Sequence, residues 1–288
     1  MKKYSKRLLA VMMVVMLCFG VSGSLTAGAL RFNPPYFWGN SRHSRIASDV
    51  NANRNRVTTI RFNLSSTVQN RPSTHNSNWV HRHRDAMWDA VNDWSWVMTP
   101  GRVRNLDYRG VNLNFASGAP TTGITIHMEF FEVNDPNSSS LGWVELFNSG
   151  TRVRPWNTAN NWNFGRAVLN RSSRPRPEDL HTQLAARGRS WINARTRAAS
   201  APTAAERLLY RTRYEHYYRQ EVRKLWNHEI GHILGLAHSN RDVHNGDNSR
   251  PVVPYAGDVG ILMTPWMNVS TAYVPTRNDV EGVIQLYR

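Results

Sequence analysis

The chain has 288 residues, which is enough for one large domain or two small ones, and its 11 tryptophans can supply a real hydrophobic core. Its 36 Lys and Arg outnumber its 20 Asp and Glu, and the formal net charge of +16 disfavours cationic partners. The single cysteine, Cys18, excludes an intrachain disulfide and any site built from several thiolates.

Residues 1–29 have the three parts of a secretory signal peptide. Basic residues precede an apolar run, Leu8–Val21, and the small-residue cleavage site Ala27-Gly28-Ala29 follows it. The alternative, an uncleaved membrane anchor, needs a longer apolar run. We therefore expect a secreted, extracellular protein that begins at Leu30. It has no cysteine, and its net charge is +12 because residues 1–29 hold four basic and no acidic side chains.

The arginines of the remaining chain favour anionic partners such as acidic proteins, cell-wall polymers, lipid headgroups or nucleic acid. They are scattered rather than grouped in blocks, so solubility alone is an equally good explanation. Residues 30–56 form a polar N-terminal segment rich in Arg and Asn, for which we expect a loop or an extended arm.

Several strands and one helix are expected before residue 172. The apolar residues of Asn78–Met98 recur at spacings of 4, 3 and 4, which predicts a helix with one buried stripe. Alternating or β-branched residues predict strands at Thr58–Leu64, Val111–Phe115, Ile124–Val133, Trp143–Phe147 and Trp162–Leu169. His127 and Glu129 lie two apart on one face of a strand and could bind metal, but we expect a solvent-facing pair.

Residues 172–203 are rich in Ser, Pro, Arg and Ala and are interpreted as an insertion. Ala204–Lys224 is predicted to be a helix that continues into the next segment. Its tyrosines and arginines suit nucleic acid or glycans, although such residues more often pack their stems over a core. They are Tyr210, Tyr214, Tyr217, Tyr218, Arg207, Arg211, Arg213 and Arg219.

The segment Trp226–His238 reads W-N-H-E-I-G-H-I-L-G-L-A-H and contains the pattern H-E-x-x-H-x-x-G-x-x-H. Apolar residues at helical spacing, among them Trp226, predict that it begins as a helix. His228 and His232 are one turn apart, so both imidazoles project to the same side. Gly235 permits a sharp turn that brings His238 back as a third ligand.

Three neutral imidazoles suit zinc and leave a fourth tetrahedral position for water. Glu229 stands beside the first histidine of the motif, where it can reach that water as a general base. The sequence therefore predicts one catalytic Zn²⁺. Calcium has no clear motif, because the oxygen-bearing side chains after His238 match no calcium-loop spacing. These are Asp242, Asn245, Asp247 and Asp258.

The motif resembles the zinc-binding signature of the metzincin peptidases and is most similar to that of the matrixins, the matrix metalloproteinase family. Ile261–Pro265, I-L-M-T-P, resembles the family's Met-turn. Asn278–Tyr287 resembles the last matrixin helix, with Asn278 expected as its N-cap and Glu281 at the capping-box position. Arg84–Trp94 is similar to the first matrixin helix.

This resemblance covers roughly residues 57 to 288 and implies an α+β, metzincin-like catalytic domain there. It implies a twisted, mostly parallel sheet with one antiparallel edge strand, and an active-site helix beneath the cleft. Trp162–Leu169 is the candidate for the edge strand. Met263 would form a floor under the metal. Pro265, Trp266 and Met267 stand where the family has its specificity pocket, but they do not keep the Pro-x-Tyr pattern.

The sequence thus predicts a secreted, monomeric zinc metalloendopeptidase that hydrolyses internal bonds of protein or peptide substrates and has no specific nucleic-acid partner. Three alternatives stay open. One is a zinc hydrolase of cell-wall peptides. The second is a non-catalytic binder of an anionic surface or polymer. The third is a bacterial toxin with one specific host target.

Overall fold

The computed structural model describes residues 41–69, 83–118, 126–138, 140–154, 160–170, 203–238, 262–263 and 274–288, without the side chains of residues 206–218. All of them belong to one compact unit, residues 35–288. None of the helices in these ranges is long and apolar enough to cross a bilayer. The expected signal peptide, the insertion up to residue 202 and the calcium candidates after His238 lie outside the described residues, as do Pro265, Trp266 and Met267.

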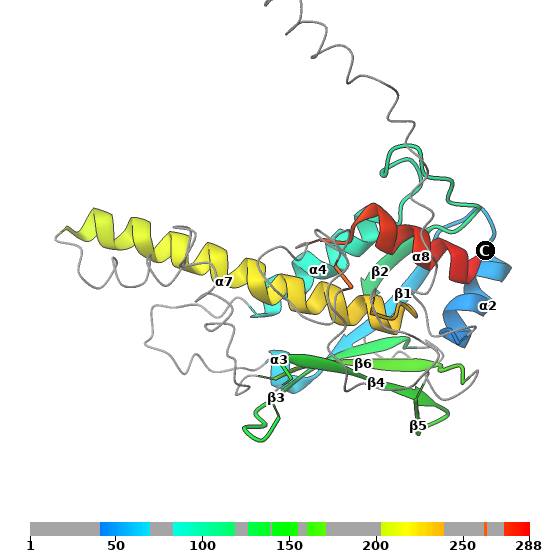
Figure 1. Cartoon of the computed structure of the whole chain (residues 1–288), viewed down its shortest axis with the longest axis horizontal. Helices are drawn as coiled ribbons and strands as arrows, with labels where there is room; N and C mark the ends of the chain where they lie inside the picture. Colours follow the sequence, from blue (N-terminus) through cyan, green and yellow to red (C-terminus); the bar gives the residue numbers. More distant parts are fainter. Residues whose placement is uncertain are drawn as a thin grey trace, which may run out of the picture. The chain divides into compact units, whose positions relative to one another are not determined.

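A six-stranded mixed sheet forms the centre of the fold (Figure 1), and its strand order is β2-β1-β3-β6-β4-β5. The strands are β1 (Thr58–Leu64), β2 (Leu113–Ser117), β3 (Met128–Val133), β4 (Gly142–Asn148), β5 (Thr151–Val153) and β6 (Phe164–Asn170). The first four strands in this order pair in parallel, whereas β4 is antiparallel to β6 and β5 is antiparallel to β4. The predicted α+β class is therefore confirmed.

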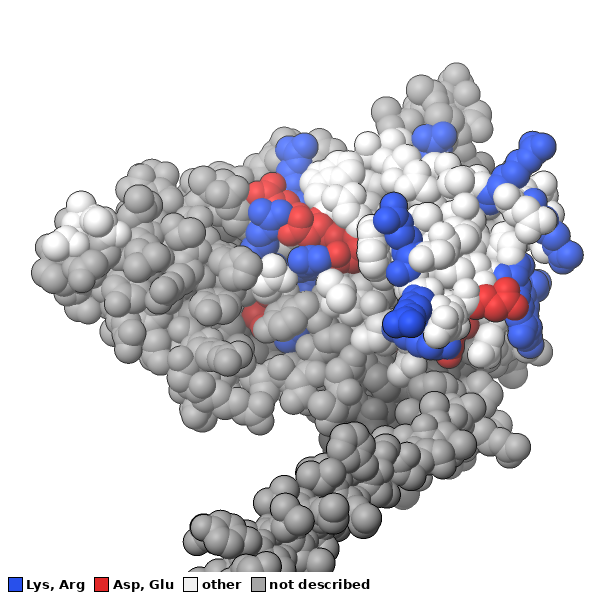
Figure 2. All heavy atoms as spheres, turned by 90° about the horizontal axis from the view of Figure 1, so that it is seen from above, with Lys and Arg blue, Asp and Glu red and all other residues white. Residues whose placement is uncertain are grey.

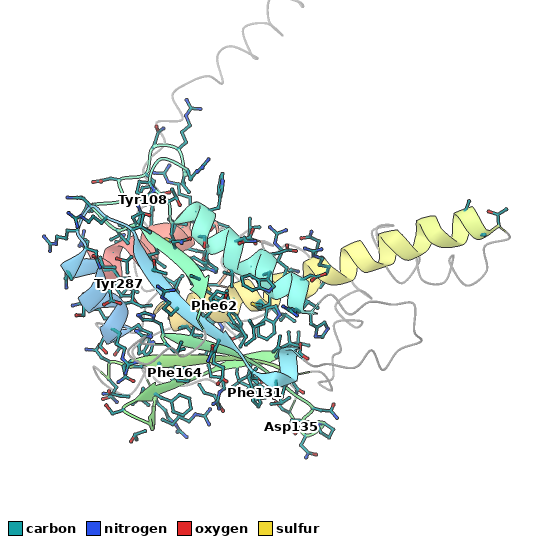
Figure 3. The ribbon with its side chains drawn as sticks, turned by 180° about the vertical axis from the view of Figure 1, so that it is seen from behind. Phe62, Tyr108, Phe131, Asp135, Phe164 and Tyr287 are labelled. Atoms are coloured by element: carbon teal, nitrogen blue, oxygen red, sulfur yellow. The ribbon has the colours of Figure 1, made fainter. Side chains whose placement is uncertain are left out.

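The helices α4 (His83–Val97) and α7 (Ala204–Ile233) cover one face of this sheet (Figure 1). Alternation along the strands sends residues such as Phe62 and Phe130 into the core between them, where Phe130 lies edge-on to Trp226 at 5.4 Å between ring centroids. Figure 3 shows Phe62, Phe131 and Phe164 on the strands from behind. Both predicted helices are confirmed, and α7 carries the first half of the metal motif.

Ion pairs hold α7 against α4 along one side. Arg219 donates two hydrogen bonds to Asp89, at 2.5 and 2.6 Å, and Arg223 makes the same two-pronged contact with Asp93 one turn further on. Bidentate Arg–carboxylate pairs fix direction as well as distance. The two turns of α7 that directly precede the motif are therefore fixed against α4.

Residues 44–52 form the helix α2 (Ser44–Ala52), which corrects the expectation of a loop or arm over residues 30–56. His43 caps the helix by accepting a hydrogen bond from the Ile46 amide at 3.3 Å. Ile46, Ala47 and Val50 form its buried stripe. Because only three apolar residues mark this stripe, the helical periodicity is short, and the polar composition of the segment led to the expectation of a loop.

The prediction that Trp162–Leu169 is an edge strand was wrong. The corresponding strand β6 lies inside the sheet between β3 and β4, and the antiparallel β4–β5 hairpin forms the edge. Other strand bounds differ slightly. β2 begins two residues later than expected, and β3 begins at Met128 rather than Ile124.

The last helix is α8 (Arg277–Tyr287), and its cap differs from the expected one. Thr276 is the N-cap, and its backbone amide and hydroxyl both donate to Asp279 Oδ2 at 2.7 Å. Asn278 is inside the helix, and Glu281 pairs with Arg277 at 2.9 Å instead of capping. The helix buries one face, which includes Val280, Val283, Ile284 and Tyr287. A short helix, α3 (Ser66–Gln69), completes the described elements.

Candidate metal centre

The two helical histidines of the motif project from the last two turns of α7. Trp226 Nε1 donates to the His83 carbonyl at 3.3 Å, and Trp94 Nε1 donates to the Asn227 carbonyl at 3.0 Å. Both bonds tie the turn before His228 to α4. The helix face that carries His228 and His232 is therefore fixed from behind by buried tryptophans.

The helix ends in a turn at Gly235, whose φ of +107° is open to glycine but strained for other residues. The Gly235 amide donates to the His232 carbonyl at 3.0 Å, and the Leu236 amide donates to the Gly231 carbonyl at 2.9 Å. A Cβ at position 235 would lie 2.8 Å from Leu286 Cδ1. Gly235 therefore meets two requirements at once, a positive φ and close packing.

Two aromatic side chains cap the free carbonyls at this helix end. Trp162 Nε1 donates to the Ile233 carbonyl at 3.0 Å, and the Tyr287 hydroxyl donates to the Leu234 carbonyl at 3.0 Å. Sequence reasoning did not identify either residue as part of the site. Each is distant in sequence from the carbonyl that it caps, so no local pattern could have revealed it.

The chain then returns His238 to the other two histidines. His238 Nε2 lies 3.0 Å from His228 Nε2 and 3.1 Å from His232 Nε2. His228 Nδ1 contacts the Leu262 carbonyl at 3.0 Å, and His232 Nδ1 contacts the Leu236 carbonyl at 2.8 Å. Because a carbonyl only accepts, both Nδ1 atoms must carry the proton.

This tautomer leaves lone pairs on the Nε2 atoms of His228 and His232, where both face His238 Nε2. Burial lowers the pKa of His228 to about 4, which keeps it neutral. Neutral imidazoles with converging lone pairs are a site for a cation. In a tetrahedral zinc site with Zn–N distances of about 2.0–2.1 Å, ligand nitrogens are separated by roughly 3.3 Å, close to these distances. The group His228, His232 and His238 could therefore hold a metal ion.

Glu229 is buried on the neighbouring side of α7, 4 % exposed. Burial raises the pKa of its carboxyl to about 8, and its Oε2 atom makes no hydrogen bond within the described residues. A Cβ added to Gly142 of β4 would lie 2.9 Å from Glu229 Oε1. The carboxylate thus lies directly against the backbone of the edge hairpin, in space that only glycine leaves open. Sequence reasoning did not single out Gly142.

Met263 packs against Gly231, the first of the two glycines in Trp226–His238, which lies between the two helical histidines in the chain. Both Leu262 and Met263 are fully buried. Because the Leu262 carbonyl accepts from His228, this two-residue segment contacts a histidine and the helix backbone together. The expected position of Met263 as a floor under the histidines stays a prediction.

Asp279 on α8 supports the same segment. Burial raises the pKa of Asp279 to about 6, although contacts with Thr276 and with the backbone of Leu262 and Met263 lower it. Sequence reasoning had assigned this residue no role. A capping-box acid at the third helical position is a local signal that would have found it.

Asp279→Asn is expected to change how stability depends on pH. Because the folded pKa of Asp279 is about 6 and its ordinary value is 3.8, the unfolded chain loses this proton first. Stability from this group is therefore complete below pH 4 and falls as the pH rises to about 6, by roughly 3 kcal/mol at 1.36 kcal/mol per pKa unit.

The amide variant cannot ionise at this position. As the pH rises from about 4 to about 6, its free energy of unfolding should therefore rise relative to that of the wild type, whatever constant difference the substitution itself introduces. Urea unfolding at a series of pH values measures the difference. The exposed Asp107→Asn is the matched control and should follow the wild type. A constant difference between Asp279→Asn and the wild type would contradict the assigned ionisation.

His127 and Glu129 lie elsewhere and do not form the solvent-facing pair that was expected. His127 is buried, accepts from the Arg61 amide at 2.9 Å and contacts Asp49 of α2 through Nε2 at 3.0 Å. Glu129 pairs with Arg166 at 2.8 Å. The unexpected helix α2 supplies the Asp49 contact and explains why His127 is buried.

No known family model matches this chain, and no curated protein matches it. A search of the solved structures does return matches. One of these is described as "GM1 bound form of the ECX AB5 holotoxin"; the match has 18% sequence identity and a TM-score of 0.41, and covers 86% of this chain and 84% of that chain. A likeness of this size carries no argument about the activity of the present protein.

Proposed function

We propose that this protein is a secreted, zinc-dependent endopeptidase. The observation that supports the proposal most strongly is the convergence of three histidine nitrogens beside a buried carboxylate. A donor set of three neutral imidazoles without a thiolate suits zinc better than the harder Mg²⁺ or Ca²⁺. His228, His232 and His238 would hold the metal.

When bound, zinc would polarise the scissile carbonyl and acidify a water molecule. The protein's own contribution to the proton transfers is Glu229. A bound cation nearby would lower the pKa of the Glu229 carboxyl from about 8 and so supply the ionised form that a general base needs. The Oε2 atom of Glu229, which has no hydrogen-bond partner in the described structure, would accept the proton of the attacking water and pass it to the leaving amine. The Leu262 and Leu236 carbonyls would keep the imidazoles of His228 and His232 in the tautomer that presents Nε2.

The edge hairpin offers a place for an extended substrate. β5 pairs with β4 only at Leu146–Asn148, and no described strand pairs with the outer edge of residues 142–145. An added peptide strand there would satisfy the free backbone groups of β4. Because Gly142 lies against Glu229, such a peptide would run past the proposed base.

Gly142→Ala is expected to lower turnover about 100-fold without loss of metal, because a displacement of about 1 Å at a catalytic group has an effect of that size. The added methyl group would meet Glu229 Oε1 and the Val168 carbonyl, both at 2.9 Å, and the backbone carbonyl cannot move away. Gly118→Ala is the control, because its methyl group would meet only the Ile126 and Arg61 side chains. Equal activities of the two variants would contradict the proposed position of Glu229.

The test of the whole proposal is zinc content and casein or gelatin hydrolysis by the chain that begins at Leu30, with and without a chelator. One zinc per chain and chelator-sensitive cleavage are expected. Cleavage of purified cell wall but not of casein would favour the cell-wall alternative. Absence of zinc from the well-folded protein would overturn the proposal.

A further inference from the structure

Seven exposed arginines come from three segments that are separate in sequence. Figure 2 looks onto the face that carries α8, where blue basic side chains border white ones. The first segment is the turn after α2, the second is the loop between α4 and β2, and the third is α8 with its C-cap residue. Their arginines are Arg54 and Arg56, then Arg102, Arg104 and Arg109, then Arg277 and Arg288.

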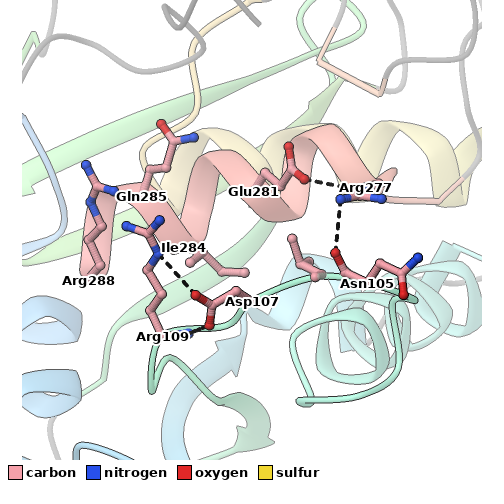
Figure 4. A pocket seen from close by; sticks show the side chains of 9 residues that line it. Asn105, Asp107, Arg109, Arg277, Glu281, Ile284, Gln285 and Arg288 are labelled. Atoms are coloured by element: carbon pink, nitrogen blue, oxygen red, sulfur yellow. Dashed lines mark hydrogen bonds and ion pairs between the residues drawn. The ribbon is translucent and has the colours of Figure 1, made fainter. Parts of the chain in front are cut away.

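Contacts between these segments make them one continuous surface. Arg277 Nη2 donates to the Asn105 carbonyl at 3.1 Å, which joins α8 to the loop. Asn55, between the two arginines of the first segment, lies against Gly110 at the end of the loop. A recess of ≈ 260 Å³ lies between the loop and α8, and Arg109, Arg277 and Arg288 line it (Figure 4).

Large apolar side chains are exposed beside these arginines. Val57, which follows Arg56, is 54 % exposed, and Val274, just before α8, is 39 % exposed. Trp96 is 53 % exposed, and the Arg102 Cζ atom lies 5.9 Å from the centroid of its ring. No other large apolar side chain is exposed in the described part of the chain. Because these apolar side chains accompany the arginines instead of being scattered singly over the protein, they indicate an interaction surface.

Few carboxylates compensate this charge. Asp107 and Glu281 line the recess, and they pair with Arg109 at 3.5 Å and with Arg277 at 2.9 Å. The other five arginines make no ion pair with any described residue. The surface, hereafter the Arg–Trp surface, is thus cationic and apolar at once.

We propose that the Arg–Trp surface binds the surface of a bilayer that contains anionic phospholipids. Guanidinium groups pair with lipid phosphates in two-pronged geometry. Trp is the side chain that best fits the boundary between headgroups and acyl chains, and the two valines add apolar contact. A soluble sulfated polysaccharide would be attracted by the arginines but would make little contact with Trp96, Val57 and Val274. Nucleic acid could stack a base on Trp96, but exposed valines offer it no such contact. The inference does not depend on the proposed peptidase activity.

The experiment is co-sedimentation of the chain that begins at Leu30 with vesicles of phosphatidylcholine, with or without phosphatidylglycerol. Binding is expected only to the anionic vesicles, and it should weaken at high salt. The triple variant Arg102→Gln/Arg104→Gln/Arg109→Gln should bind about 100-fold more weakly, because each arginine near an anionic membrane contributes about fivefold. Trp96→Ser should bind about tenfold more weakly, since it removes an interfacial aromatic side chain.

The matched control removes the same charge elsewhere. Arg84, Arg152 and Arg154 are also exposed, and the triple variant Arg84→Gln/Arg152→Gln/Arg154→Gln should bind anionic vesicles nearly as the wild type does. Equal losses in the two triple variants would show that net charge alone attracts the protein and would overturn the proposal. So would undiminished binding of Trp96→Ser, or binding to dextran sulfate with none to vesicles. Circular dichroism verifies that each variant is folded.

Discussion

Glu229→Gln is expected to lower kcat/KM for a peptide substrate by about 10³–10⁴-fold, near the upper end of what a general base contributes. The amide has nearly the same shape as the carboxylate but cannot accept the proton of the attacking water. Glu229 is not among the proposed metal ligands, which are three histidines, so the zinc content should equal that of the wild type. Metal analysis and peptide cleavage on the same preparation test both halves of the prediction.

The control is Glu129→Gln, which makes the same chemical change to a carboxylate that pairs with Arg166 on the sheet. It should keep full activity. Loss of zinc from Glu229→Gln would mean that this carboxylate serves the metal centre rather than proton transfer. Comparable activity of Glu229→Gln and the wild type would falsify the assignment of the base.

The sequence motif was sufficient to predict that the three histidines converge, because the information in it is local. The spacing of His228 and His232 needs only a helix, and the apolar period of α7 predicts that helix. Gly235 was singled out for backbone freedom, and its φ of +107° agrees. The return of His238 follows from a turn within three residues of that glycine.

The parts that failed depend on partners distant in sequence. Alternation identified β6 as a strand, but nothing in Trp162–Leu169 states which strands flank it, so its position inside the sheet was missed. Gly142 is half-buried on the edge hairpin, and its importance comes only from its contact with Glu229, which is distant in sequence. The Arg–Trp surface likewise joins three segments, each of which carries only two or three arginines.

The buried residues that hold the turn after α7 also lie far from it in sequence. Trp162, from the segment just before β6, and Tyr287, from the last helix, donate to consecutive carbonyls at the end of α7. Together with Leu286 against Gly235, they hold the turn in place from behind. The pattern H-E-x-x-H-x-x-G-x-x-H thus specifies the three converging histidines, whereas the position of His238 also depends on residues outside the pattern.

Zinc is expected to raise the Tm of the chelator-treated protein by on the order of 10 °C. A ligand at about 1,000 times its Kd stabilises the fold by about 4 kcal/mol. In a protein of this size, each kcal/mol shifts the Tm by roughly 2–4 °C. The shift should persist in Glu229→Gln, whose histidines are intact, and should nearly vanish in His238→Ala, because two imidazoles on one helix face leave the metal poorly enclosed.

Gly235→Ala separates the geometry of the turn from the identity of the ligand. All three histidines remain, but the new Cβ would lie 2.8 Å from Leu286 Cδ1, on a backbone with φ +107°. Relaxation of this strain moves the turn that leads to His238, so the zinc-induced shift should be smaller than in the wild type and larger than in His238→Ala. Differential scanning calorimetry with titrated zinc gives all four values. If His238→Ala kept the full shift, the third ligand would have to be another residue, and the role assigned to the Gly235 turn would be lost with it.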